Sequence, residues 1–169
     1  MKIICIFADQ LFTFHYDNFV DNEYDRLMEL WTDVEYLRNY AIQNNIDDIN
    51  SFINDILLNA EQIEVLLDYL YQNNLTFGTY FEPIQESERK KQLALQKGKI
   101  EKNRLRLYAI KLEDNCYVIT GGAIKMSQTM QEHPDTEHEL TKLNAARAYL
   151  KSNNVFDDDS FYEFLIEEL

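Results

Sequence analysis

The stretch RLRLYAIKLEDNCYVITGGAIK, residues 104–125, restricts the fold more than any other part of this sequence. It has the alternation of two strands joined by a tight turn, with the polar residues 113–115 at the turn. Because side chains alternate between the two faces of a strand, Arg104 and Arg106 are expected on one face. Residues 116–120 are almost wholly apolar or β-branched, which is typical of a central strand. The pattern predicts an antiparallel sheet organised around this hairpin.

The remaining strands are expected at the N-terminus and just before the hairpin. Residues 2–16 predict a long first strand with a break near residues 8–10, and residues 81–126 supply the rest of the sheet. Lys97-Gly98-Lys99 has the composition of a loop tip. Gly121-Gly122 predicts a bulge, a bend or a close backbone approach where the second strand of the hairpin ends.

Apolar residues at spacings of three and four predict helices before and after the sheet. A long helical section covers residues 21–72, and a capping-box pattern at Asn59 leaves open whether its second part is one helix or two. A C-terminal helix and an acidic tail occupy residues 136–169, with Thr136 and Glu139 as a capping-box pattern at the start. The tail is expected to be an amphipathic helix that docks on the domain, binds a partner or straps over the basic residues.

These elements together predict one α+β domain of 169 residues. We expect an antiparallel β-sheet of about four strands, packed with N-terminal helices and a C-terminal helix.

Charge is distributed unevenly along the chain. Residues 1–88 hold 3 Lys and Arg against 17 Asp and Glu, and residues 112–169 hold 4 against 12. Residues 89–111 hold 9 Lys and Arg and a single acidic residue, Glu101. The overall net charge of −14 argues against a general nucleic-acid binder, because such a field repels phosphate. The basic segment 89–111 indicates a narrower, local contact.

Several common functional classes find no support in the sequence. No apolar run approaches 18–20 residues, and residues 1–8 fit a strand better than a signal peptide, so a cytoplasmic location is expected. Cys5 and Cys116 lie in apolar, strand-like runs and are expected to be buried, reduced thiols. His133 and His138 flank a proline at a spacing that does not give one helix face, and no glycine-rich phosphate loop is present. No metal or other cofactor is therefore expected.

The hairpin also carries a family resemblance. An Arg-Leu-Tyr strand, an acidic turn, the sequence YVITGGAIK, a polar break and a final helix follow one another here. This order resembles the RelE/ParE toxin superfamily, and most closely its HigB-like branch. Residues 81–84, FEPI, are similar to the Pro-Leu element that precedes the second strand in such proteins, and the resemblance covers roughly residues 81–150. The chain departs from the family in its acidity, its long helical section and Lys125-Met126-Ser127, where the family has Lys-Lys-Thr.

The resemblance implies a RelE-like fold and a toxin of a type II toxin–antitoxin system. Such a toxin is a metal-independent, ribosome-dependent endonuclease of messenger RNA that an antitoxin protein neutralises. This cleavage requires activation of a ribose 2′-hydroxyl, stabilisation of negative charge on the phosphorane and protonation of the leaving oxygen. The side chains expected to do this are Arg104, Arg106, Lys125 and His133, with Tyr108 as the alternative to His133. The residues expected to contact RNA are Lys97, Lys99, Lys102 and Tyr108.

Other interpretations are compatible with the same residues. In so acidic a chain, lysines and arginines on a half-exposed strand commonly pair with carboxylates of the helices. A catalytically inactive protein of RelE fold could bind a protein partner through the basic hairpin. Inhibition of a topoisomerase, as in the ParE branch, needs no catalytic cluster. The expected partners are an antitoxin and ribosome-bound messenger RNA and not a membrane, and the sequence leaves the oligomeric state and the cleavage specificity open.

Overall fold

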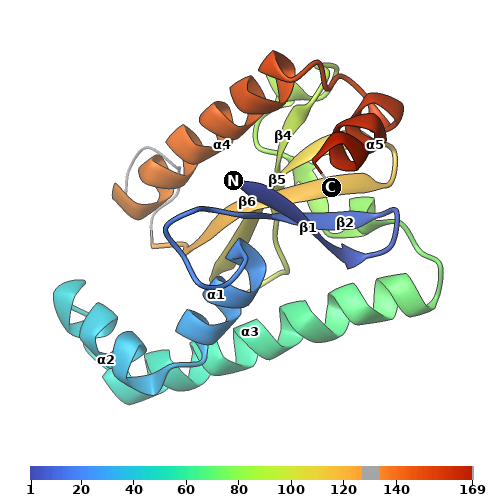
Figure 1. Cartoon of the computed structure of the whole chain (residues 1–169). Helices are drawn as coiled ribbons and strands as arrows, with labels where there is room; N and C mark the ends of the chain where they lie inside the picture. The colour runs from blue at the N-terminus through green and yellow to red at the C-terminus, as the bar shows by residue number, and fades with distance from the viewer. Residues whose placement is uncertain (127–133, 169) are drawn as a thin grey trace.

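The computed structural model describes residues 1–126 and 134–168. Within these residues the fold is α+β, and a mixed six-stranded sheet is covered by helices on both faces (Figure 1). The N-terminal helices pack on one face and the C-terminal helices on the other, so a hydrophobic core lies on each side of the sheet. No helix in the described part of the chain is long and apolar enough to cross a membrane.

The strands of the described residues lie in the order β1-β2-β6-β5-β4-β3. Neighbouring strands are antiparallel except β2 and β6, which are parallel. The α+β class is thus confirmed, whereas the expectation of about four strands, all antiparallel, is wrong in number and in one pairing. The strands are β1 (Lys2–Phe7), β2 (Leu11–His15), β3 (Phe81–Pro83), β4 (Ala94–Gly98), β5 (Leu105–Glu113) and β6 (Cys116–Ile124).

The predicted first strand over residues 2–16 is a hairpin of two strands. Asp9 has a left-handed backbone conformation, with φ of 66°, at the turn between β1 and β2. This turn places β2 beside β6 and leaves β1 at the edge of the sheet. The edge position explains why Cys5 is exposed, contrary to expectation, whereas Cys116 in β6 is buried as expected; both thiols are free.

The β5–β6 hairpin forms as predicted and lies at the centre of the sheet. The register shifts between Tyr108 and Ala109, which leaves Thr120 as the extra residue of a bulge, directly before the two glycines. The loop-tip prediction for Lys97-Gly98-Lys99 is wrong, because Lys97 and Gly98 belong to β4 and pair with β5.

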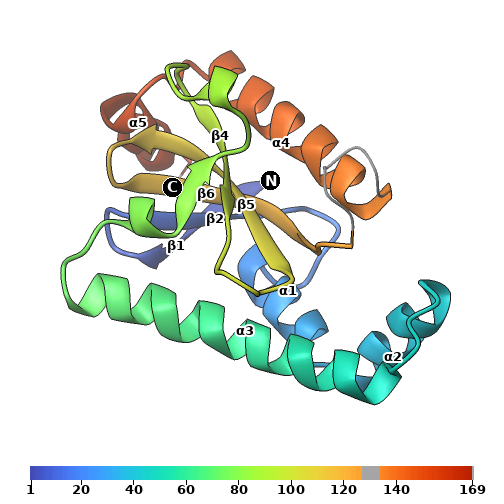
Figure 2. The ribbon, with the colours of Figure 1, turned by 180° about the vertical axis from the view of Figure 1, so that it is seen from behind.

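Three helices, α1 (Glu23–Trp31), α2 (Val34–Gln43) and α3 (Ile49–Gln72), cover one face. The Asp33 carboxylate accepts a hydrogen bond from the backbone N–H of Tyr36 at 3.1 Å, so the chain begins a second helix there. α3 is one continuous 24-residue helix that runs across the sheet (Figure 2), so no helix begins at Asn59. Instead the Asn59 side-chain oxygen accepts the backbone N–H of Arg104 at 2.9 Å and ties α3 to the start of β5.

The other face is covered by α4 (Pro134–Ser152) and α5 (Asp158–Glu167). The capping-box prediction at Thr136 and Glu139 is wrong, because α4 already includes both residues and both are buried. The acidic tail docks on the domain. Phe161 and Phe164 of α5 are buried, and the Phe161 ring lies 5.0 Å from the ring of Phe12 in β2.

The buried carboxylate of Glu88 connects α4 with β4, near the edge of the sheet opposite β1. Glu88 accepts hydrogen bonds from Arg147 of α4 at 2.6 Å, from Lys91 at 3.0 Å and from the backbone N–H of Leu95 at 3.0 Å. Burial alone would raise the pKa of Glu88, but these donors together lower it below its usual value. The carboxylate is therefore a charged structural group, because its three donors outweigh its desolvation.

Replacing Glu88 by alanine is expected to lower the free energy of unfolding by about 3–5 kcal/mol, because the largely buried guanidinium of Arg147, 15% exposed, loses its partner. Glu86→Ala is the matched control, since exposed Glu86 pairs with exposed Arg89, at 2.8 Å, and its loss should change the free energy of unfolding far less, because solvent screens the pair. Urea denaturation followed by circular dichroism measures both values. Equal losses in the two variants would contradict this role for Glu88.

Candidate functional site

The structure brings two of the predicted catalytic cations together, Arg104 and Lys125. They are neighbours across the open end of the β5–β6 hairpin, where the backbone N–H of Lys125 donates to the carbonyl oxygen of Arg104 at 2.6 Å. Arg104 is exposed, and its guanidinium carbon lies 5.6 Å from the centre of the Phe52 ring in α3. This end of the sheet therefore carries at least one accessible guanidinium that an anionic ligand can reach.

Arg106 and Tyr108 have more internal surroundings. Arg106 is half-buried and donates hydrogen bonds to the carbonyl oxygens of Asn103 at 2.6 Å and Leu105 at 3.0 Å. Burial lowers the pKa of Arg106, and burial raises the pKa of Tyr108 to about 12. Tyr108 is only 1% exposed, so its hydroxyl is not available to a ligand in this conformation. The Arg106 guanidinium holds the turn before β5.

The predicted RNA-contacting lysines lie along β4 and the turn that follows it. Lys97 is half-buried and paired in register with Glu82 of β3, and the Lys99 ammonium lies 4.0 Å from the Glu82 carboxylate. Lys102 is exposed at a turn position with φ of 64°. His133 lies outside the described residues. The basic segment is thus partly neutralised by carboxylates of its own neighbourhood.

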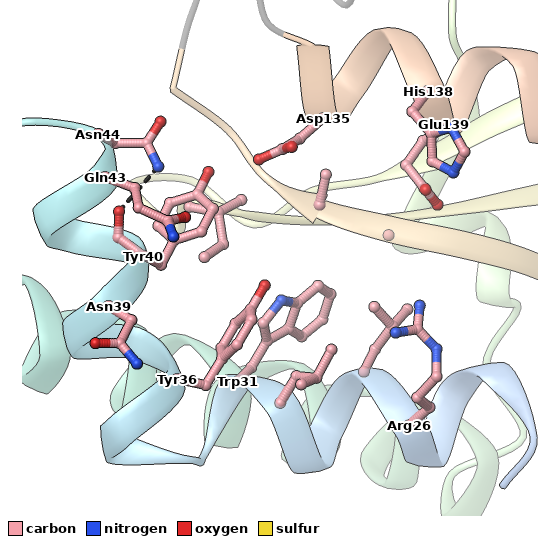
Figure 3. Close-up of a pocket in the computed structure, with 15 residues that line it drawn as sticks. Arg26, Trp31, Tyr36, Asn39, Tyr40, Gln43, Asn44, Asp135, His138 and Glu139 are labelled. Atoms are coloured by element: carbon pink, nitrogen blue, oxygen red, sulfur yellow. Dashed lines mark hydrogen bonds between the residues drawn. The ribbon is translucent and has the colours of Figure 1, made fainter. Parts of the chain in front are cut away.

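A cleft of about 600 Å³ lies beside the end of β6, between α1, α2 and α4 (Figure 3). Figure 3 shows Asp135, His138 and Glu139 of α4 along one side of the cleft and Arg26 of α1 on the opposite side, below Glu139. α2 closes one end with Tyr40 and several carboxamide side chains. A concave site with few, convergent polar and titratable groups is the usual form of a ligand-binding or catalytic pocket.

Buried charges border this cleft. The Glu23 carboxylate is fully buried and accepts two hydrogen bonds from Arg26, at 2.9 and 2.6 Å. It also accepts one from Lys142 of α4, at 2.8 Å. The Lys142 ammonium lies 3.3 Å from the carboxylate of Glu139, farther than from Glu23. Glu23, Arg26, Lys142 and Glu139 form one network, which we call the cleft charge network.

Glu139 is the carboxylate of the network whose negative charge is least balanced by nearby cations. Burial raises the pKa of Glu139, and the charge of Glu23 raises it further, while Lys142 lowers it only in part. Its carboxylate occupies the space above Gly121, where an added Cβ would lie 1.8 Å from a Glu139 oxygen. A protonated Glu139 leaves two cations against one anion in the network, which is a net charge of about +1. An anion balances this charge, either the ionised Glu139 itself or a bound ligand that takes its place.

A row of aromatic side chains connects the cleft with the basic hairpin. The rings of Tyr36 and Tyr40 lie 6.3 Å apart, and the Tyr40 ring stacks on Phe52 at 6.0 Å. The Arg104 guanidinium lies over the Phe52 ring. Burial, followed by the nearby carboxylate of Asp135, raises the pKa of Tyr40. The cleft and the exposed arginine are therefore joined by one wall of aromatic side chains.

Sequence reasoning missed Arg26, Lys142 and Glu139 as site residues. Glu139 fitted a local capping pattern, which hid its long-range partners. A usable signal was the scarcity of cations outside the basic segment, because Arg26 is one of only 3 Lys and Arg in residues 1–88. A lone cation in so acidic a segment is expected to have a specific partner.

Comparison with protein-family models, with curated proteins and with solved structures finds no match for this chain. Within residues 1–126 and 134–168, no group of three or more His, Cys, Asp or Glu side chains is arranged to hold a metal ion. The interpretation of the site depends on its own geometry.

Glu139→Gln is expected to raise the melting temperature at about pH 8, because a neutral amide avoids the burial of charge that raises the pKa of Glu139. A carboxyl with a raised pKa contributes its full stability below its unfolded value of 4.5 and loses it as the pH rises through the folded value. The advantage of the variant should therefore shrink toward pH 4.5 and below. Glu137→Gln, at an exposed position of the same helix, is the control. Thermal denaturation across this pH range measures the difference, and a glutamine variant that is less stable at high pH would contradict the assignment.

Proposed function

We propose that this protein is a toxin of a type II toxin–antitoxin system, similar to the HigB-like branch of the RelE/ParE superfamily, and that it cleaves messenger RNA without a metal. The observation that carries the proposal is the cleft at the end of β6, where Glu139, with its raised pKa, lies in a network that favours an anion. The resemblance of residues 81–150 supplies the reaction class, and the cleft supplies groups for acid–base chemistry.

Phosphate binding follows from the charges of the cleft. When Glu139 is protonated, Arg26 and Lys142 together exceed the single charge of Glu23. Arg26 is partly exposed and lines the cleft, so its guanidinium can donate to a phosphate oxygen while still paired with Glu23. The same guanidinium would stabilise the added negative charge of the phosphorane.

Proton transfers would involve the two α4 residues that face the cleft. His138 would take the proton of the 2′-hydroxyl as that oxygen attacks the phosphorus. Glu139 would donate its proton to the 5′-oxygen as the P–O bond breaks, leaving a 2′,3′-cyclic phosphate and a 5′-hydroxyl. Burial raises the pKa of Glu139 above its usual value, which is the direction that a general acid requires.

The basic hairpin would hold RNA next to the cleft. Arg104 is exposed and connected to the cleft wall through Phe52 and Tyr40, and Lys99 and Lys102 are exposed on the preceding turn. These side chains can contact phosphates on either side of the cleaved one. Because the rest of the chain is acidic, we propose that contact with RNA is limited to this end of the sheet and requires the ribosome to present the message.

A second candidate function has its own support. Arg106 is held by backbone carbonyls, and Arg89, Lys91 and Lys99 lie beside carboxylates. These bonds favour a structural or partner-binding surface over a cluster prepared for phosphorane stabilisation. The alternative is therefore a catalytically inactive protein of RelE fold that binds a protein partner through its basic hairpin.

Induced expression in bacteria, together with cleavage of reporter messenger RNA in a translation extract, tests the proposal. The wild-type protein should arrest growth and cleave the message, whereas Glu139→Gln should lower the cleavage rate by about 100-fold or more, because the general acid is removed. Glu137→Gln, at an exposed position of the same helix, should behave as the wild type. Arg104→Ala should raise the amount of RNA needed for half-maximal rate and change the maximal rate little, because Arg104 lies outside the cleft.

Two results would contradict this function. Growth and message that are unaffected by the folded wild-type protein would exclude the nuclease and leave the partner-binding alternative. Equal activity of Glu139→Gln and the wild type would show that the chemistry does not use the cleft.

A further inference from the structure

A second concave surface lies on the other side of α1, between α1, α3 and β1. It has a volume of about 780 Å³ and is lined by residues from these three elements and by no residue of the cleft. We call it the α1–α3 groove. Its floor is apolar, with Phe7 of β1, Met28 of α1 and Leu57 of α3, all of them half-buried. Val65 of α3 stands at its border with 60% of its side chain exposed.

The border of the groove is acidic. Asp25 of α1 and Glu61, Glu64 and Asp68 of α3 line it, and all four are exposed. α3 contains no lysine or arginine in its 24 residues, and no cation of the described residues forms an ion pair with any of the four carboxylates. Elsewhere in the molecule, buried carboxylates such as Glu23 and Glu88 have cationic partners. The groove is thus an apolar surface with negative charge that the chain itself leaves uncompensated.

The field of these carboxylates reaches the floor. Burial raises the pKa of the Tyr24 hydroxyl, and the charges of Glu64, Asp25 and Asp68 raise it further. A ligand that brings positive charge to the border and apolar surface to the floor would relieve both the repulsion and the exposure.

We infer that the α1–α3 groove binds an amphipathic helix with lysine or arginine on its flanks, supplied by a partner protein. The wall from Leu57 to Asp68 is about 16 Å long, which matches about three helical turns of a ligand. The apolar stripe of such a helix would cover Phe7, Met28 and Val65, and its cations would reach Glu61 and Glu64. The inference does not depend on RNA cleavage, because the groove shares no residue with the cleft.

Charge also argues against the other occupants. A second copy of this chain carries the same net charge of −14, and its acidic helices would be repelled from the groove; its basic segment lies in strands and turns, so it offers no basic amphipathic helix. Nucleic acid and anionic lipid are repelled for the same reason. β1 is an edge strand and could accept a strand from a partner, but Asp25, Glu61 and Glu64 lie on helices, away from such a contact.

The test uses the full chain and a labelled 18-residue peptide of leucine and lysine, with leucine at helical spacing, in fluorescence anisotropy titrations. We expect one-to-one binding that weakens as salt is raised and is at least 10-fold weaker for a scrambled peptide of the same composition. The double variant Glu61→Lys and Glu64→Lys should bind at least 10-fold more weakly. The control, Glu163→Lys and Glu167→Lys, makes the same change in net charge on exposed positions of α5 and should bind like the wild type. Val65→Asp tests the apolar contact at an exposed position, where the substitution should not disturb folding.

Hydrogen exchange of the complex distinguishes the remaining outcomes. Protection confined to α1 and α3 supports the inference, whereas new protection of the outer edge of β1 would show strand addition and overturn it. Absence of binding by the patterned peptide at micromolar concentration, or equal losses in both double variants, would also overturn it. None of these results bears on growth arrest, so the groove and the nuclease proposal can fail separately.

Discussion

The ion pairs of Glu23 are the interaction on which the arrangement around the cleft depends. α1 and α4 cover opposite faces of the sheet, yet both supply cations to this one carboxylate, at 2.6 Å from Arg26 and 2.8 Å from Lys142. Both helices lie close to β6 at this point. Gly121 and Gly122 allow this approach, because a side chain on Gly121 would meet Glu139, and one on Gly122 would meet Trp31 and the Arg106 carbonyl. The packing of Glu139 and Trp31 against β6 therefore depends on the two glycines that follow the bulge at Thr120.

Cations are few in the whole molecule, as they are around the cleft. With 16 Lys and Arg against 30 Asp and Glu, cations are scarce, and three of the seven outside the basic segment, Arg26, Lys142 and Arg147, pair with the buried carboxylates Glu23 and Glu88. Carboxylates without such partners are concentrated on the outer helices, and at the α1–α3 groove they border exposed apolar side chains. Repulsion between them is tolerable on a solvated surface, because water and salt screen it. It becomes a binding determinant where apolar surface is present as well.

The sequence predicted those parts of the fold that depend on residues close together in the chain. The β5–β6 hairpin, its turn and the disturbance at the two glycines all follow from alternation and turn chemistry within about twenty residues. The parallel pairing of β2 with β6 could not be predicted in this way, because it joins residues about one hundred positions apart after three helices. Nor could the cleft, whose side chains come from four separate elements.

Two misassignments have the same physical cause. Asn59 and Glu139 each fitted a local capping pattern, and each is used for a long-range contact, Asn59 with the backbone of Arg104 and Glu139 with Lys142. A polar side chain on the inner face of a helix must be satisfied, and when a strand end or a charge is within reach, that partner replaces the cap.

Glu139 distinguishes a structural from a functional explanation of the cleft. An ionised Glu139 balances the charges of Glu23, Arg26 and Lys142, but its carboxylate lies 3.3 Å from the Lys142 ammonium whereas that of Glu23 lies at 2.8 Å, so its buried charge is less well compensated. Glu139 is 6% exposed, and its burial raises the pKa more than the nearby Lys142 lowers it. The ionised form of this carboxyl is therefore less favourable than it would be in water. Carboxyls with a raised pKa are found at active sites, where they serve as general acids, as well as in structural ion-pair networks. The position of Glu139 above Gly121, facing the cleft and beside His138, is consistent with that use, and under the proposed function the exposed Arg104 at the end of the same aromatic wall would contact the substrate.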